Sequence, residues 1–218
     1  MSVTLELSQM TSDIQKYRQN LFDISKRIEV INDHLKGISK TKYLVTEVEF
    51  LCLQFRKVLE IIALSSIVAN KDEYSKQREK FAKDWNAKYI LQDLKRVNPK
   101  FYPIPAKVSA RLIDGKHIFE SLPVTDGFLT EEEFVDVLEK CGGMLHAENP
   151  FAQKKDLLKI RAEFPVWFKK IVRLLDHHIM ELVDGQTMLS AHMMGKGGHP
   201  QVAQFTVMKD SNGNPISA

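Results

Sequence analysis

Three charged side chains lie along one face of a segment that is apolar on most of its other sides. Between Thr41 and Ala69 the chain places Glu49, Arg56 and Glu60 among leucine, isoleucine, valine and phenylalanine. At about 100° per residue these positions share one helical face, and Arg56 and Glu60 have the spacing of an ion pair. Because burying charge is costly, the stripe is either a structural ion pair or one wall of a functional site.

A second candidate segment is KCGGMLHAENP, residues 140–150. Its paired glycines allow another backbone or a ligand to approach a helix closely. An imidazole at a helix end, here His146, can serve as a general acid or base. Lys140, Glu148 and Asn149 flank it with groups that could hold a substrate. The alternative interpretation is a histidine that caps the helix by bonding a neighbouring carbonyl.

Together the two segments resemble the HEPN superfamily. The resemblance is carried by R-K-V-L-E at residues 56–60 and L-H-A-E-N-P at residues 145–150, and it covers roughly residues 41–180. It implies a helical bundle, often a homodimer, and in many members a metal-independent ribonuclease of antiviral defence or toxin–antitoxin systems. In those members the arginine and histidine of an Arg-x(4–6)-His motif act on the scissile phosphate.

The chain departs from that ribonuclease motif at the arginine. Lys140 stands at the expected distance before His146, and lysine lacks the planar fork that grips two phosphate oxygens. A literal Arg-x(4)-His occurs at Arg173 and His178, but it lies in a strongly apolar stretch and has the look of a chance match. Arg56 could supply the missing cation in space.

The predicted site therefore has two groups of residues. The catalytic candidates are Glu49, Arg56, Glu60 and His146, and the substrate-binding candidates are Lys140, Glu148 and Asn149. We predict no metal and no cofactor. The expected function is an RNA-cleaving or RNA-binding effector, with RNA, a second copy of the chain or another protein as partner. The alternative is a non-catalytic binding, regulatory or oligomerisation module.

Other clusters of polar side chains are weaker candidates. Asp176, His177 and His178 are adjacent, so a helix would point them to different faces, which makes a poor metal site. His192 and His199 flank a glycine-rich turn without a third ligand. The last helix also carries basic residues that either face RNA or form an ordinary solvated surface. They are Lys154, Lys155, Lys159, Arg161, Lys169 and Lys170.

Composition limits the class of protein. The 218 residues are 44% hydrophobic and 27% charged, as in a globular protein, and a formal charge of +3 is too balanced to indicate a nucleic-acid or membrane partner. Cys52 and Cys141 lie in apolar helical patterns and are expected to be reduced core residues. Without a signal-peptide pattern or a long apolar run, we expect a cytoplasmic protein with no membrane segment.

The pattern predicts a mainly α fold of about five helices with an internal and a C-terminal β-hairpin. Residues 1–40 repeat apolar side chains every three or four positions, and this heptad seam packs within the protomer or forms a dimer. Residues 41–183 form the HEPN-like core, residues 184–210 the C-terminal hairpin, and residues 211–218 a flexible tail.

Within the core we expect helices over about 41–69 and 71–97, and then a hairpin around Asp114-Gly115, a favoured two-residue turn. Thr130 begins the next helix with a capping box to Glu133. The last helix is predicted over 153–183, with a kink or restart at Pro165. Two strands, about 187–194 and 201–208, complete the chain.

Overall fold

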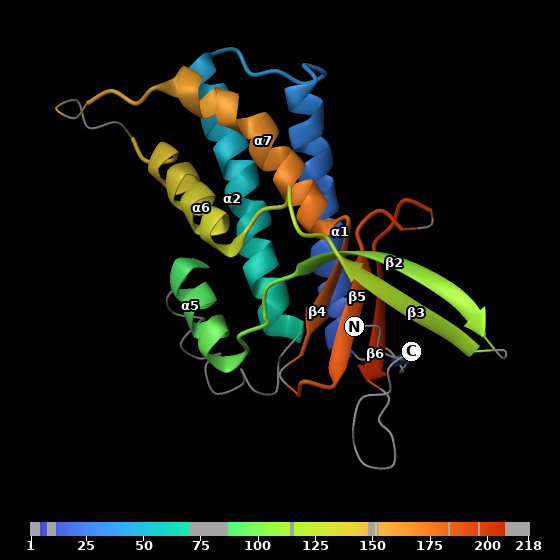
Figure 1. Ribbon diagram of the computed structural model, residues 1–218. Coiled ribbons are helices and arrows are strands. Elements are labelled where there is room, and N and C mark those ends of the chain that lie inside the picture. Colours follow the sequence, from blue (N-terminus) through green and yellow to red (C-terminus); the bar gives the residue numbers. More distant parts are fainter. Residues whose placement is uncertain are drawn as a thin grey trace.

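Helices lie on the left and across the top of Figure 1, and the strands lie at the lower right. The computed structural model describes residues 5–7, 12–69, 87–113, 116–147, 151, 153–182, 184–195 and 197–207. The described helices are α1 (Ser12–Leu35), α2 (Leu44–Ala69), α5 (Ala87–Val97), α6 (Glu131–Met144) and α7 (Leu157–Leu175). The fold is therefore helix-rich, as the sequence predicts. Within these residues, no helix combines the length and apolar composition needed to cross a bilayer.

The strands form one antiparallel sheet rather than two separate hairpins. They are β1 (Leu5–Leu7), β2 (Ile104–Ile113), β3 (Lys116–Pro123), β4 (His177–Glu181), β5 (Thr187–His192) and β6 (Gln201–Val207), in the order β1-β6-β5-β4-β2-β3. The internal hairpin is confirmed by the β2–β3 register, in which Ile113 pairs with Lys116. Its turn, residues 114 and 115, lies outside the described residues. The hairpin joins the sheet where Ile104 pairs with Ile179.

The prediction of a last helix reaching residue 183 is wrong. α7 runs through Pro165 but ends at Leu175, and His177–Glu181 is strand β4. The apolar spacing from Ile171 through Leu174 to Ile179 fits a helix, and this spacing is the reason for the wrong prediction. Burial instead alternates along β4, and its backbone groups pair with β5 on one side and β2 on the other. Sheet pairing outweighs local spacing here.

The heptad seam of the first helix packs inside the protein. Ile14, Tyr17, Leu21, Ile24 and Ile31 are all buried in the core that α1 shares with α2 and the rest of the chain. Along α1 the seam is therefore internal. The repeat begins later than predicted, because Leu7 belongs to β1, where it pairs with Phe205. Residues 8–11 lie outside the described residues.

A local sequence signal sets the start of α6, and a contact with a distant residue follows the end of α5. The capping box is confirmed: Glu133 N–H donates to Thr130 Oγ1 at 3.3 Å, and Thr130 N–H donates to Glu133 Oε2 at 3.2 Å. Asn98 follows α5, and its side chain donates to the Glu181 carbonyl at 2.8 Å. The earlier part of the helix predicted over 71–97, up to residue 86, lies outside the described residues.

One buried polar contact ties α1 to β4. The Tyr17 hydroxyl lies 2.6 Å from His178 Nε2, and His178 Nδ1 lies 3.0 Å from the Leu175 carbonyl. A carbonyl only accepts, so Nδ1 carries the proton and Nε2 accepts from the tyrosine hydroxyl. Burial lowers the pKa of His178 from 6.5 to about 4 and raises the pKa of Tyr17 above its usual value.

Acid should weaken the fold through His178. Since its folded pKa lies below the unfolded one, its stabilising contribution is complete above pH 6.5 and is lost as the pH falls towards 4. The loss is on the order of 3 kcal/mol. We expect the free energy of unfolding, measured in denaturant between pH 7 and about pH 4.5, to fall more steeply in the wild type than in His178→Leu. Equal slopes in the two proteins would contradict this role.

Candidate functional site

Glu60 is the buried centre of the polar stripe on α2. It is 4% exposed, and its carboxylate accepts from Arg56 Nε at 2.9 Å and from Lys57 Nζ at 3.0 Å. Burial alone raises the pKa of Glu60, but the hydrogen bonds from Arg56 and Lys57 outweigh it and hold the pKa below its usual value. The ion pair predicted from the spacing of Arg56 and Glu60 is confirmed, and Lys57 joins it.

Glu49 is not part of this network. Its side chain is exposed and makes no ion pair within the described part of the chain. It precedes Arg56 by seven residues, roughly 10 Å along the helix axis. The stripe therefore has a solvated first residue and a charge-paired second half.

Arg56 reaches across from α2 to the glycine pair of α6. A Cβ atom added to Gly142 would lie 2.9 Å from Arg56 Nη1, whereas one added to Gly143 would meet nothing within 4 Å. Gly142 thus leaves the space that the guanidinium occupies. The close approach expected from the paired glycines is an approach by Arg56, and it needs only the first of the two.

His146 lies just beyond the end of α6. It follows Gly142 by four residues, about one helical turn, so the structure brings Arg56 and His146 to the same end of this helix. The imidazole is exposed and, among the described residues, makes no hydrogen bond to a carbonyl of the kind a helix cap would need.

The substrate-binding candidates have different positions. Lys140 donates to Glu163 at 2.6 Å and lies over the Trp167 ring, with Nζ 5.7 Å from its centroid. It is therefore engaged with α7. Glu148 and Asn149 lie outside the described residues.

The two cysteines are core residues, as predicted. Cys52 and Cys141 are fully buried and free. The hydrogen bond with Cys52 and burial together raise the pKa of the Cys141 thiol. A buried, protonated thiol is a poor nucleophile and a poor metal ligand.

Arg173 and His178 do not form a site, although they have the literal motif spacing. His178 is buried against Tyr17, while Arg173 Nε donates to the Asp126 carbonyl at 2.8 Å in an exposed position. The described residues also bring no three His, Cys, Asp or Glu side chains together in an arrangement that could hold a metal ion.

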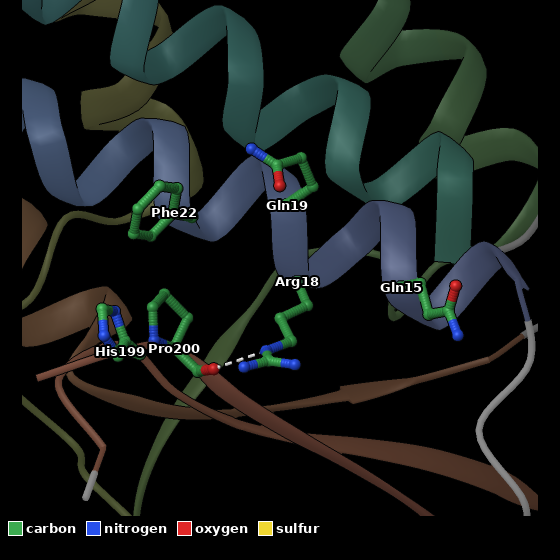
Figure 2. A pocket seen from close by; sticks show the side chains of 6 residues that line it. All are labelled: Gln15, Arg18, Gln19, Phe22, His199 and Pro200. Atoms are coloured by element: carbon green, nitrogen blue, oxygen red, sulfur yellow. Dashed lines mark hydrogen bonds between the residues drawn. The ribbon is translucent and has the colours of Figure 1, made fainter. Parts of the chain in front are cut away.

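The glycine-rich turn between β5 and β6 is a hairpin turn that packs on α1. Figure 2 shows the hollow between them, of about 500 Å³, where Arg18 Nε donates to the Pro200 carbonyl at 2.9 Å. His199 lies against Phe22, with ring centroids 6.0 Å apart, while His192 stacks on His177 at 5.2 Å. The two histidines that could have met across the strands therefore have different partners.

Half of the basic residues near the last helix are already engaged. Lys155 donates to the Gly143 carbonyl, Arg161 to Glu47 at 2.8 Å, and Lys170 to Glu133. Lys154, Lys159 and Lys169 are exposed and have no ion-pair partner within the described ranges. Only part of this run of positive charges is therefore left without a hydrogen-bond or ion-pair partner among the described residues.

Sequence reasoning missed a basic end formed by two segments far apart in the chain. Residues 36–43 contain three lysines and no acid, and residues 151–161 contain four cations and one acid. We call residues 36–43, 151 and 153–161 the basic end. The connection from α1 to α2 and the start of α7 lie together at the top of Figure 1. The lack of acids and the three lysines in residues 36–43 indicate a basic surface. The sequence does not show that the start of α7 lies next to this loop.

Two features place the start of α7 beside the ends of α1 and α2 that flank residues 36–43. Arg161 pairs with Glu47 of α2 at 2.8 Å. A hollow of about 370 Å³ is also lined jointly by His34 and Leu35 at the end of α1, by Glu47, and by Leu158 of α7. Lys155 further links the basic end to the end of α6, next to His146.

Alanine should be tolerated differently at the two glycines of α6. Gly143→Ala adds a methyl group in open space and should stabilise the helix by about 0.5–1 kcal/mol. Gly142→Ala forces Arg56 to move and weakens its bond to Glu60, so it should gain less or lose stability. The free energy of unfolding in denaturant is the measurement. Equal gains at both positions would show that Gly142 is not needed to seat Arg56.

Comparison with protein-family models, with curated proteins and with solved structures finds no match for this chain. The resemblance to HEPN proteins therefore depends on the quoted sequence motifs alone. What the protein does has to be argued from the geometry of its surface.

Proposed function

We propose that this protein binds single-stranded RNA across its basic end. The observation that carries the proposal is the combination of exposed aromatic rings and unpaired lysines on two adjoining segments. The ring of Phe151 is 96% exposed and that of Tyr43 is 59% exposed. Proteins that bind single strands combine these same two elements: cations that follow the phosphates and rings on which bases stack.

The lysines supply the phosphate contacts. Lys36, Lys40 and Lys42 on one segment, and Lys154 and Lys159 on the other, are exposed and lack ion-pair partners among the residues described. Arg161 has Glu47 as its counter-ion, and Asp156 is occupied in capping α7. The remaining positive charge is therefore available to a polyanion.

The aromatic rings favour a single strand over a duplex. Lys42 Nζ lies over the Tyr43 ring, 5.4 Å from its centroid, so a cation and an aromatic ring are held close together on this segment. Base stacking on an exposed ring contributes about 1–3 kcal/mol, and the bases of a duplex are not accessible to it. The HEPN-like motifs make RNA the polymer to test first.

Removing rings and charges should weaken RNA binding in different ways. Phe151→Ser should lower affinity for an unstructured RNA roughly 5- to 150-fold at constant salt dependence, because it removes a stacking surface and no charge. Lys154→Gln with Lys159→Gln should lower affinity and reduce the salt slope by about 0.7 for each phosphate that the protein no longer neutralises. Fluorescence anisotropy across a salt series measures both quantities.

Lys95→Gln is the matched control. Lys95 lies on α5, away from the basic end, and is paired with Glu131 at 3.0 Å. Its replacement should leave RNA affinity almost unchanged. An equal loss in this variant, or no RNA binding at low salt by the wild type, would refute the proposal.

RNA cleavage at the adjoining end of α6 is the second candidate function. It is favoured by the placement of Arg56 at Gly142, one turn before His146, which would put a guanidinium and an imidazole near one phosphate. Part of the Arg56 side chain, 33%, remains exposed although its Nε is used by Glu60. Such a pair could stabilise charge on the phosphate and move a proton without a metal.

His146→Ala tests this second function. If the wild type cleaves RNA in the presence of a chelator, this variant should lose cleavage and keep RNA binding, because His146 is exposed and outside the core. His199→Ala, at another exposed histidine, is the control and should cleave normally. Unimpaired cleavage by His146→Ala would remove His146 from the site, and a wild type that binds but never cleaves RNA would be a non-catalytic binding module.

A further inference from the structure

A second cationic site lies at the opposite end of α7 from the basic end. The C-terminal half of α7, the start of β2 and the start of β4 enclose a cavity of about 430 Å³. Its apolar wall comes from Phe168 and Val172 of α7 together with Ala106 and Val124. This volume is within the range of small-molecule sites, about 300–1,000 Å³.

Three cations surround this apolar wall. Lys169 and Arg173 stand four residues apart on α7, a spacing at which like charges repel, and Lys107 faces them from β2. Lys107 and Lys169 have no ion-pair partner in the described part of the chain. Repulsion of this kind is relieved when an anion binds between the charges.

Arg173 is held in position before any ligand arrives. Its Nε donates to the Asp126 carbonyl, and its Cδ and Nε would lie only 3.2 and 3.1 Å from a Cβ atom on Gly127, a residue with φ of +74°. The Asp126 carboxylate, 3.6 Å from Nη2, is 88% exposed and neutralises little of the charge. The guanidinium thus keeps donors available towards the cavity.

The remaining polar groups lie where β4 begins. His177 Nε2 is 3.1 Å from Ser190 Oγ, and the His177 ring stacks on His192. Asp176 is the one acid among the lining residues and lies 3.8 Å from His192 Nε2. These groups can exchange hydrogen bonds with hydroxyl groups of a ligand, and one carboxylate does not balance three cations.

We propose that this cavity binds a phosphate monoester that carries a flat aromatic body and hydroxyl groups, the chemistry of a nucleoside monophosphate. The doubly charged phosphate would lie among Lys107, Lys169 and Arg173, and the body against Phe168 and Val172. A dianion matches this charge better than a carboxylate does. The hollow of Figure 2 is a weaker candidate for such a ligand, because Arg18 is the one Lys or Arg among its described lining residues and already donates to Pro200.

Calorimetric titration of the full chain with adenosine monophosphate, inorganic phosphate and adenosine tests the proposal. Adenosine monophosphate should bind at least about tenfold more tightly than either of the other two, since only it offers both charge and body. No binding of adenosine monophosphate at about 1 mM, or equal binding of inorganic phosphate, would overturn the proposal.

Two variants place the ligand. Lys169→Gln and Lys107→Gln remove exposed charges that the core does not need, and each should weaken binding of adenosine monophosphate roughly five- to tenfold. Lys159→Gln, on the same helix but in the basic end, should leave this affinity unchanged although it weakens RNA binding. Unaltered affinity in Lys169→Gln would overturn the assignment. Because the two proposals depend on different lysines, each can fail without the other.

Discussion

The hydrogen bonds of His178 determine how the two halves of this fold meet. Nδ1 donates to the Leu175 carbonyl at the last residue of α7, and Nε2 accepts from Tyr17 of α1. One imidazole therefore joins the first helix, the last helix and strand β4. The side chain is fully buried, and both of its ring nitrogens have a hydrogen-bond partner in the neutral form. The turn from α7 into β4 also places Asp176 and His177 at the cavity beside Arg173.

The Arg56–Glu60 pair is a second constraint on the fold. Arg56 can neutralise the buried carboxylate of Glu60 and still offer hydrogen-bond donors to a ligand. Glu60 needs a cation because its carboxylate is buried, and Arg56 Nε meets that need. The guanidinium extends beyond Glu60 to the surface of α6, where Gly142 leaves room for it. A planar group with several donors can hold a buried carboxylate on one edge and offer the other edge to a phosphate. Glu49, which is solvated, lies outside this ion-pair network.

Features set by neighbours in the sequence could be predicted, and features set by distant partners could not. The Thr130–Glu133 capping box, the strands beside Asp114-Gly115 and the Arg56–Glu60 pair all depend on residues within four positions of each other. Strand β4 was misread because Ile179 continues a helical spacing, and only pairing with β2 and β5 makes it a strand. The basic end was missed for the same reason, because residues 36–43 and 151–161 become neighbours only through the packing of α2 and α7.

The distribution of charge carries more information about partners than its sum. A formal charge of +3 is uninformative by itself, yet a few short segments carry charge of one sign, among them residues 36–43 and 131–133. Three consecutive glutamates begin α6, where their negative charge stabilises the positive N-terminal end of the helix dipole. Among the described residues, lysines without ion-pair partners remain at both ends of α7. Charge that is neither paired nor used to cap a helix adds repulsion to the folded state, and a bound anion relieves it. The two ends of α7 are therefore the places where anionic ligands would add most to stability.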